Sequence, residues 1–312
     1  MGVAGRAAKV AGNRIEVEIE GKSVRLSNLD RVIYPETGFT KGDLIDYYVK
    51  VAPVLLPHLK DRPVTLRRFP EGVGEPGFWQ KNCSAGRPFW MRTVSVESGT
   101  GDDSVDYCLI DDEAGLAWLA NAAGLEIHTS LASASGRTCP DSVVFDLDPG
   151  EPAGIAQCSQ VALTIKGTLE ELGLHSVAKT SGSKGMQVYI PLNSGASYPV
   201  TKKFAHMIAR AMESEMSDLV LSRMNRGLRE GKVFIDWSQN SEHKTTVSVY
   251  SMRARSTPSV SVPLRWEEVE AVVDGKPGDA LRFGPEETLE RVASLGDLFS
   301  ELLSLRQTLP LA

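Results

Sequence analysis

The sequence has no long apolar runs, no closely spaced cysteine pairs and no excess of basic residues. No apolar segment approaches the roughly 18 residues that a membrane-spanning helix needs. The N-terminal segment 1–13 has no apolar stretch of the kind found in signal peptides. We therefore expect a cytoplasmic protein with a disordered tail over residues 1–13.

The four cysteines are widely separated and form no Cys-x-x-Cys motif. They are Cys83, Cys108, Cys139 and Cys158. This spacing argues against a disulfide framework or a zinc site. Reduced thiols, which are usual in the cytosol, are the expected state.

The net charge of −6 is not typical of nucleic-acid-binding proteins, which are often basic. It does not exclude such binding, because a local basic face is sufficient. Of the 312 residues, 42% are hydrophobic and 24% are charged, which suits one large globular domain or two lobes.

Helical and strand patterns both occur, without a strict βαβ repeat. Alternating or continuous apolar patterns predict a hairpin at 14–27 and strands at 63–69, 142–147, 174–179, 186–191, 232–237 and 245–252. Amphipathic patterns predict helices at 40–51, 112–123, 155–172, 199–215, 265–272 and 285–305, with an interruption at Pro53 and Pro57 and a loop at 99–103. This mixture predicts an α+β fold rather than a Rossmann fold.

Two aspartates stand at the end of a predicted strand, where residues 142–150 read Ser-Val-Val-Phe-Asp-Leu-Asp-Pro-Gly. Residues two apart on a strand share a face, with Cα atoms roughly 6.6 Å apart. Asp146 and Asp148 would repel each other unless a cation lay between them, and divalent metals with oxygen ligands are the usual solution. The pair indicates metal-assisted phosphoryl chemistry, although two such residues can also face solvent or cap a helix.

A glycine-rich turn and a third acidic residue extend this pattern. Residues 180–185 read Thr-Ser-Gly-Ser-Lys-Gly between two predicted strands, and this composition suits either a phosphate cradle or a plain hairpin turn. The spacing of a Walker A loop is absent. Asp236 ends the apolar segment Val-Phe-Ile-Asp and could complete a two-metal cage.

Several cationic and aromatic residues are also candidates for binding. Arginines such as Arg67 and Arg253 suit bidentate phosphate contacts, although a single surface arginine is usually only solvated. Phe78 and Trp79, followed by Lys81, could stack on a nucleic-acid base or be buried. A histidine on an apolar strand, such as the one at position 128, is more often structural.

Taken together, these motifs resemble the archaeo-eukaryotic primase superfamily, and above all its bacterial branch. That branch comprises the polymerase domain of DNA ligase D and standalone primase-polymerases of the ligase C-associated type. The resemblance extends from about Val24 to Leu305. Its nine ordered segments begin at Leu26, Thr40, Arg62, Phe78, Glu126, Phe145, Thr180, Val233 and Tyr250.

The resemblance implies a fold of mixed and antiparallel sheets, with an RRM-like catalytic core flanked by helices. It also implies two closely packed lobes: an N-terminal lobe over 14–110 that holds a DNA 5′-phosphate pocket, and a catalytic lobe over 111–312.

The same resemblance implies roles for individual residues. Two divalent ions, Mn²⁺ or Mg²⁺, would be held by the catalytic residues Asp146, Asp148 and Asp236. The nucleoside triphosphate would be bound by Ser181, Lys184, His128, Arg67, Arg253, Gln239 and Gln187. The 5′-phosphate of the downstream strand would be bound by Asn28, Arg31 and Lys41. The template strand would meet Phe78, Trp79 and Lys81.

The sequence departs from the family pattern at three of these positions. Gln187 stands where a histidine is usual; it can donate a hydrogen bond to phosphate but cannot become cationic. Arg31 and Trp79 replace a common lysine and phenylalanine, and they keep the charge and the ring. We expect the activity to survive these changes, with altered triphosphate affinity or metal dependence.

The function implied is a DNA-dependent nucleotidyltransferase that fills short gaps during repair and prefers ribonucleotides. A monomer acting with a separate ATP-dependent ligase and Ku on nucleoid DNA is expected, because the polymerase unit accounts for the chain. Excision repair, end joining and priming from scratch all stay open.

Two other functions fit parts of the pattern. Phe-Asp-Leu-Asp also resembles the first motif of haloacid-dehalogenase-type phosphatases, but that motif normally lies near a domain start and continues with Gly-Thr. A non-catalytic module that binds DNA ends or gaps is the alternative outside enzymes. Template-dependent extension distinguishes the proposed polymerase from both.

Overall fold

The computed structural model describes residues 8–11, 14–97 and 104–310. The chain forms two compact units. Unit 1 comprises Met1–Thr129 and Ser251–Pro258, and unit 2 comprises Ser130–Tyr250 and Ser259–Ala312. The expected lobe boundary at residue 110 stays a prediction.

Unit 2 is built on one sheet with strands in the order β14, β15, β11, β13, β12 and β19. Neighbouring strands are antiparallel except for the parallel pair β14 and β15. The strands are β11 (Ser142–Pro149), β12 (Val177–Thr180), β13 (Met186–Pro191), β14 (Val220–Leu221), β15 (Val233–Asp236) and β19 (Pro263–Leu264).

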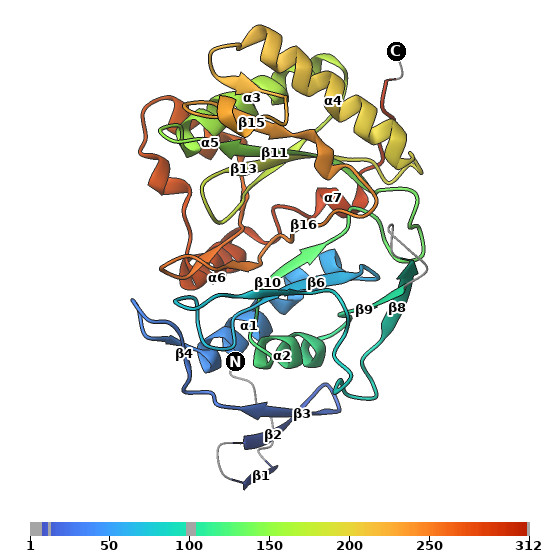
Figure 1. Cartoon of the computed structure of the whole chain (residues 1–312), viewed down its shortest axis with the longest axis vertical. Coiled ribbons are helices and arrows are strands. Elements are labelled where there is room, and N and C mark those ends of the chain that lie inside the picture. Colours follow the sequence, from blue (N-terminus) through green and yellow to red (C-terminus); the bar gives the residue numbers. More distant parts are fainter. Residues whose placement is uncertain (1–7, 12–13, 98–103, 311–312) are drawn as a thin grey trace. The chain divides into compact units, whose positions relative to one another are not determined.

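Alternation along the central strands separates a core face from a polar face. On β11, Phe145 and Leu147 belong to the apolar core that includes side chains of α3 (Ile155–Glu171) and α4 (Tyr198–Glu215). Figure 1 shows these two helices on one side of β11, β13 and β15. Since the side-chain period of a strand is two, Asp146 and Asp148 must lie on the opposite face.

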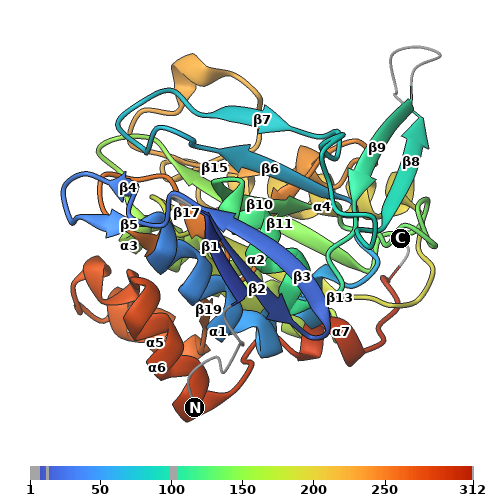
Figure 2. The same ribbon diagram turned by 90° about the horizontal axis from the view of Figure 1, so that it is seen from below.

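Unit 1 contains a second sheet, in which β6 is the central strand. It pairs with β10, and different residues of β6 pair with β7 and with β9. β9 in turn pairs with β8 (Figure 2). The strands are β6 (Val64–Arg68), β7 (Phe78–Gln80), β8 (Thr93–Glu97), β9 (Ser104–Cys108) and β10 (Gly124–Thr129). Smaller pairings join β1 (Ala8–Ala11), β2 (Arg14–Ile19) and β3 (Lys22–Ser27), and β4 (Val32–Tyr34) with β5 (Phe39–Thr40).

The first helix of unit 1, α1, spans Lys41–Leu59 and is longer than the sequence pattern predicts. Thr40 and Asp43 form a capping box at its start, which satisfies backbone donors that a helix N-terminus leaves unpaired. The expected interruption at Pro53 and Pro57 is wrong, because both prolines lie inside the helix. The buried face of α1, which includes Tyr48, holds this part of the chain in helical form.

The remaining elements agree with an α+β fold, so the expected fold class is confirmed. They are α2 (Glu113–Asn121), β16 (Thr246–Val247), β17 (Met252–Arg253), β18 (Ser259–Val260), α5 (Trp266–Val273), α6 (Pro285–Leu295) and α7 (Glu301–Ser304), with 3-10 turns η1 (Arg226–Leu228), η2 (Trp237–Gln239) and η3 (Gly278–Leu281). The helix expected at 285–305 is two helices, because α6 ends at Leu295 and is followed by Gly296, which has a positive φ of 70°.

Two expectations fall partly or wholly on residues that are not described. Of the expected tail over 1–13, residues 1–7 and 12–13 lie outside the described residues, and Ala8–Ala11 form β1. The expected loop at 99–103 also lies outside them. In the part of the chain that is described, none of the helices combines the length and the apolar character needed to span a bilayer.

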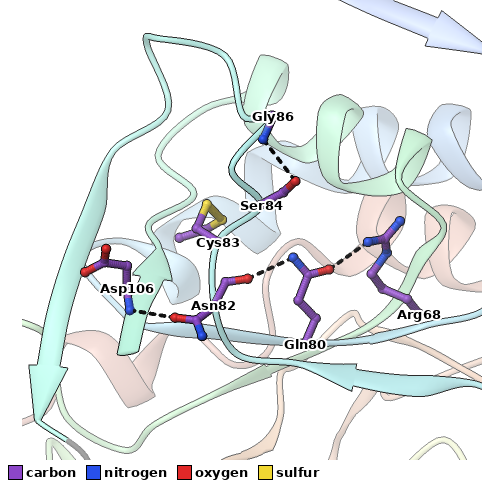
Figure 3. The surroundings of a disulfide bond; sticks show 8 residues. Arg68, Gln80, Asn82, Cys83, Ser84, Gly86 and Asp106 are labelled. Atoms are coloured by element: carbon purple, nitrogen blue, oxygen red, sulfur yellow. Dashed lines mark hydrogen bonds between the residues drawn. A yellow bond between two sulfur atoms is a disulfide. The ribbon is translucent and has the colours of Figure 1, made fainter. Parts of the chain in front are cut away.

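The expectation of four reduced thiols is wrong for one pair. Cys83 and Cys108 form a disulfide in unit 1, with Cα atoms 5.0 Å apart (Figure 3). Cys139 and Cys158 are free. The two bonded cysteines are 25 positions apart in sequence, so their proximity depends on the tertiary fold and could not be inferred from motif spacing.

Candidate functional site

A row of polar side chains crosses the face of the unit 2 sheet that lies opposite the apolar core. Asp146 on β11 lies directly opposite Asp236 on β15, and on its other side it lies opposite Gln187 on β13. Gln187 in turn lies opposite Lys179 on β12. Opposite residues of antiparallel strands have Cα atoms about 4.5–5.5 Å apart, so four neighbouring strands place one polar residue each beside the next.

Hydrogen bonds orient the two opposed carboxylates. Gln187 Nε2 donates to Asp146 Oδ1 at 2.9 Å. Asp236 Oδ1 accepts from the backbone N–H and hydroxyl of Ser238 at 3.0 and 2.5 Å, and its Oδ2 accepts from Gln239 Nε2 at 3.1 Å. Lys244 Nζ lies 3.8 Å from Asp236 Oδ2. The acids are therefore held mainly by neutral donors.

The acidic residues fit a divalent cation by their chemistry. Like charges directly opposite each other destabilise a sheet, and hard cations prefer oxygen ligands such as the carboxylates of Asp146 and Asp236. Asp148 is exposed and lies two residues further along the same face. Among the described residues, no three His, Cys, Asp or Glu side chains form a group that could hold a metal ion. The sheet thus brings two of the three expected ligands into register and leaves the third on the same face.

The glycine-rich turn between β12 and β13 packs against the end of β11. A Cβ at Gly185 would lie 2.0 Å from the carbonyl oxygen of Leu147, so only glycine fits there. Ser181 Oγ accepts from the backbone N–H groups of Ser183 and Gly185 at 3.2 and 3.3 Å, which closes the turn. Lys184 is half exposed and forms an ion pair with Glu151. The turn and the acidic strand end are therefore neighbours.

In unit 1, a buried carboxylate gathers three of the expected phosphate-binding residues. Glu126 on β10 has a side chain only 2% exposed, and its Oε2 lies 2.9 Å from His128 Nε2. Its Oε1 lies 3.4 Å from Arg67 and 3.5 Å from Arg253. Ala254 N donates to the same oxygen at 3.0 Å.

The charge state of Glu126 follows from these contacts. Burial raises its pKa, but the hydrogen bond from His128 and the charge of Arg253 outweigh burial, so the pKa falls to about 2. The carboxylate is therefore ionised at neutral pH. One buried negative charge holds two guanidinium groups and an imidazole together, and of these the Arg67 side chain is the most exposed, at 36%. Guanidinium groups suit phosphate.

The expected stacking residues lie on the edge strand β7 of unit 1. Phe78 is 46% exposed and Trp79 is 56% exposed. The Arg68 guanidinium lies 5.3 Å from the Phe78 ring centre, and that of Arg67 lies 5.7 Å from Trp79. Lys81 follows the strand and is exposed. Exposed rings backed by cations suit stacking on unpaired bases.

The residues expected to bind a 5′-phosphate are joined through their backbone at the start of α1. Arg31 N donates to Asn28 O at 3.1 Å, and Lys41 N donates to Arg31 O at 2.8 Å. Lys41 Nζ donates to Asn121 O at 3.1 Å, whereas the Arg31 side chain binds Pro70 O and Glu71. Burial, and to a lesser degree the charge of Arg31, lowers the pKa of Lys41 to about 8.

Sequence reasoning missed two residues of these clusters, Lys179 and Glu126. Lys179 is fully buried and donates to Ser261 Oγ at 2.7 Å. Both residues sit in strands that are buried at every position, which hides the alternation that marks a polar face. A charged residue inside an otherwise apolar strand was the available signal, because such residues are rarely buried without a partner.

Comparison with known proteins agrees with this fold. Residues 40–299 match the family model for the LigD primase-polymerase domain. The multifunctional non-homologous end joining protein LigD of Mycobacterium bovis is 41% identical over 288 residues, which cover 89% of this chain and 37% of that protein. The bifunctional LigD of Bacillus subtilis is 32% identical over 249 residues, covering 80% and 40%. The chain thus spans well under half the length of these relatives.

A solved structure is similar over nearly its whole length. The polymerase domain of Mycobacterium tuberculosis ligase D, in complex with DNA, superimposes with a TM-score of 0.83 and 38% identity, covering 91% of this chain and 99% of that one. Fold and sequence together define a nucleotidyltransferase. The chain belongs to the LigD primase-polymerase domain family. The resemblance drawn from the sequence motifs is confirmed.

Proposed function

We propose that this protein is a DNA-dependent primase-polymerase that fills short gaps during repair. The observation that carries the proposal is the register of Asp146 with Asp236 on the polar face of the unit 2 sheet, in a chain of this family. The solved relative that contains DNA supports nucleic acid as the substrate.

Catalysis is assigned to Asp146, Asp148 and Asp236, which would hold two divalent ions, manganese or magnesium. Such ions lower the pKa of an attacking hydroxyl and neutralise charge on a leaving pyrophosphate. Gln187 and Gln239 orient the carboxylates of Asp146 and Asp236, respectively. Orientation of this kind matters because in-line attack on an α-phosphate tolerates little displacement.

Nucleotide binding is assigned to two sets of residues. In unit 2 these are Ser181, Lys184, Gln187 and Gln239. In unit 1 they are Arg67, Arg253 and His128, oriented by Glu126. Cations held in place by hydrogen bonds stabilise the charge that develops on transferring phosphates without having to reorganise.

DNA contacts are assigned to unit 1. Lys41, together with Asn28 and Arg31, would bind the 5′-phosphate of the downstream strand. Phe78, Trp79 and Lys81 would contact the template strand.

Further parts of the proposal rest on the family alone. They are a preference for ribonucleotides, activity as a monomer on nucleoid DNA in the cytoplasm, and cooperation with an ATP-dependent DNA ligase and Ku. The names of the relatives favour end joining as the pathway.

The test is primer extension on a gapped duplex with a 5′-phosphate, with ribo- or deoxyribonucleotides and with manganese or magnesium. The wild type should extend the primer, and Asp146→Asn should lower the rate by at least about 100-fold, as loss of a group acting directly on the transition state does. Asp274→Asn is the matched control, because Asp274 is exposed at the end of α5.

Two outcomes would contradict the proposal. DNA binding without extension under any of these conditions would favour the non-catalytic gap-binding module. Extension that survives Asp146→Asn combined with Asp148→Asn would show that the catalytic acids lie elsewhere.

A further inference from the structure

The strand that carries the exposed aromatic pair is short. β7 comprises only Phe78–Gln80, and it pairs with β6 along one edge. A three-residue strand has few ladder hydrogen bonds, and fixing the backbone of each residue costs roughly 1–2 kcal/mol of entropy. Contacts beyond the strand must therefore hold the two rings in place.

On the side that precedes the strand, the backbone packs against a buried ring. A Cβ at Gly77 would lie 2.4–2.7 Å from atoms of the Phe69 ring, and Phe69 is only 4% exposed. The chain can therefore enter β7 this closely only through glycine. This contact fixes one end of the strand.

On the side that follows the strand, a series of hydrogen bonds leads to β9 (Figure 3). Arg68 donates to Gln80 Oε1 at 2.7 Å, and Gln80 Nε2 donates to the carbonyl oxygen of Asn82 at 2.8 Å. Asn82 Oδ1 accepts from the backbone N–H of Asp106 at 3.0 Å. The same Arg68 lies over the Phe78 ring, so this series ends at one of the exposed aromatics.

The disulfide comes directly after this series. Cys83 N donates to Asp106 O at 2.6 Å, and Cys83 is bonded to Cys108. Cys108 lies opposite Val64 on β6, the strand with which β7 also pairs. Both sulfur-bearing residues are buried, at 8% and 5% exposure. The disulfide thus closes a ring of contacts that runs from β6 through β7 to β9 and back to β6.

We propose that Asn82 and the Cys83–Cys108 disulfide are positioning groups that hold Phe78 and Trp79 for stacking on unpaired template bases. Reduction of the disulfide releases the segment after β7 and weakens that stacking. The inference rests on the proposed function, because it takes the aromatic pair as the template contact.

The redox step needs a two-electron reductant, and a dithiol supplies it. The dithiol transfers two electrons and two protons, the sulfur–sulfur bond breaks, and the products are two cysteine thiols and one oxidised dithiol. Cys139 and Cys158 take no part, since they form no disulfide in the described structure.

The first measurement counts thiols in the full chain purified without reductant. Denaturation with a thiol reagent should reveal two reactive thiols, Cys139 and Cys158, out of four cysteines. Four reactive thiols in protein kept under air would overturn the proposal.

The second measurement uses DNA with a recessed primer and 2-aminopurine at the first unpaired template position. In the oxidised wild type, fluorescence quenching should report stacking on an aromatic ring. Reduction with dithiothreitol, or Cys108→Ser, should weaken binding about tenfold and reduce quenching at saturating protein, the scale expected for one base–aromatic stack. Cys139→Ser is the matched control and should change neither.

A third set of variants keeps the disulfide intact. Asn82→Ala should reduce quenching and raise the KM for DNA more than it lowers kcat, and Asn82→Asp should restore both because it keeps the acceptor oxygen. Equal quenching and affinity in oxidised wild type, reduced wild type and Asn82→Ala would overturn the proposal. If the oxidised wild type fails to extend gapped DNA but these differences persist, the proposed function fails and the positioning role stands.

Discussion

The side-chain amide of Gln187 donates from Nε2 to Asp146 Oδ1 at 2.9 Å. Tyr189, on the same face of β13, donates its hydroxyl to Gln187 Oε1 at 3.0 Å. A tyrosine hydroxyl that donates to the amide oxygen leaves the amide nitrogen facing the carboxylate, so the orientation of Gln187 follows from the network. A neutral residue therefore orients Asp146.

The first prediction concerns this pair. Gln187→Ala should lower the extension rate by about 10–100-fold, because it removes a charged-acceptor hydrogen bond worth about 1.5–3 kcal/mol. It should also raise the metal concentration needed for half-maximal rate. Tyr189→Phe should have a smaller effect in the same direction, since it removes only the bond that orients the amide.

The measurement is primer extension over a manganese titration. Gln160→Ala is a suitable control, because Gln160 is exposed on α3. Gln187→Ala with an unchanged metal requirement would contradict the role assigned to Gln187.

The second prediction concerns pH and Lys41. Its pKa of about 8 means that the ammonium is mostly charged at pH 7 and mostly neutral at pH 9. A bound phosphate dianion favours the charged form, so affinity for DNA with a 5′-phosphate should fall by up to about tenfold per pH unit above pH 8. Affinity for the same gapped DNA with a 5′-hydroxyl should change much less.

Lys41→Arg provides the check, because arginine stays charged over this whole range. The variant should keep its preference for the 5′-phosphate at pH 9. A preference that falls equally in both proteins, measured by fluorescence anisotropy, would show that another group titrates.

The third prediction concerns stability in acid. The pKa of Glu126 falls from 4.5 in the unfolded chain to about 2 in the folded one. A lowered pKa stabilises the fold above the unfolded value, and this stabilisation, about 3 kcal/mol, is lost as the pH falls from 4.5 towards 2.

Glu126→Gln removes this contribution and leaves Arg67 and Arg253 without their buried partner. The difference in unfolding free energy between wild type and variant, from urea titrations, should shrink between pH 5 and pH 2.5. The exposed Glu36→Gln is the control. A difference that stays constant over this range would contradict the assignment.

Sequence patterns predicted the parts of the fold that depend on local order. Phe145 and Leu147 alternate with Asp146 and Asp148, so the sequence of this strand predicts which residues face the core and which form the acidic face. The apolar segment that ends in Asp236 indicated a third acid in the same way, and the structure places it opposite Asp146. Alternation and acidic residues at strand ends can be predicted from the sequence, because they depend only on residues that are close together in the chain.

The rest depends on contacts between distant segments. In the sequence, Glu126 is a charged residue in an otherwise apolar strand with no evident partner. The fold brings Arg67 and Arg253, which are distant in sequence, beside it. Cys83 and Cys108 pair only because β9 lies against the chain after β7. Pro53 suggests a helix end by local rules, yet burial of the α1 face outweighs the lost hydrogen bond.

The last prediction concerns the turn beside the acidic strand end. Gly185→Ala would place a Cβ 2.0 Å from the backbone carbonyl of Leu147, and a backbone atom of a central strand cannot move aside cheaply. We expect a loss of about 2 kcal/mol or more in unfolding free energy, and a fall in extension rate at saturating nucleotide, because β11 carries Asp146 and Asp148.

Gly167→Ala is the control, with an expected effect of opposite sign. It lies inside α3 with no atom within 4 Å of its Cβ position, so it should stabilise the protein by up to about 1 kcal/mol. Chemical denaturation and primer extension on both variants decide the matter: if Gly185→Ala is as stable and active as Gly167→Ala, the turn does not pack against β11 as described.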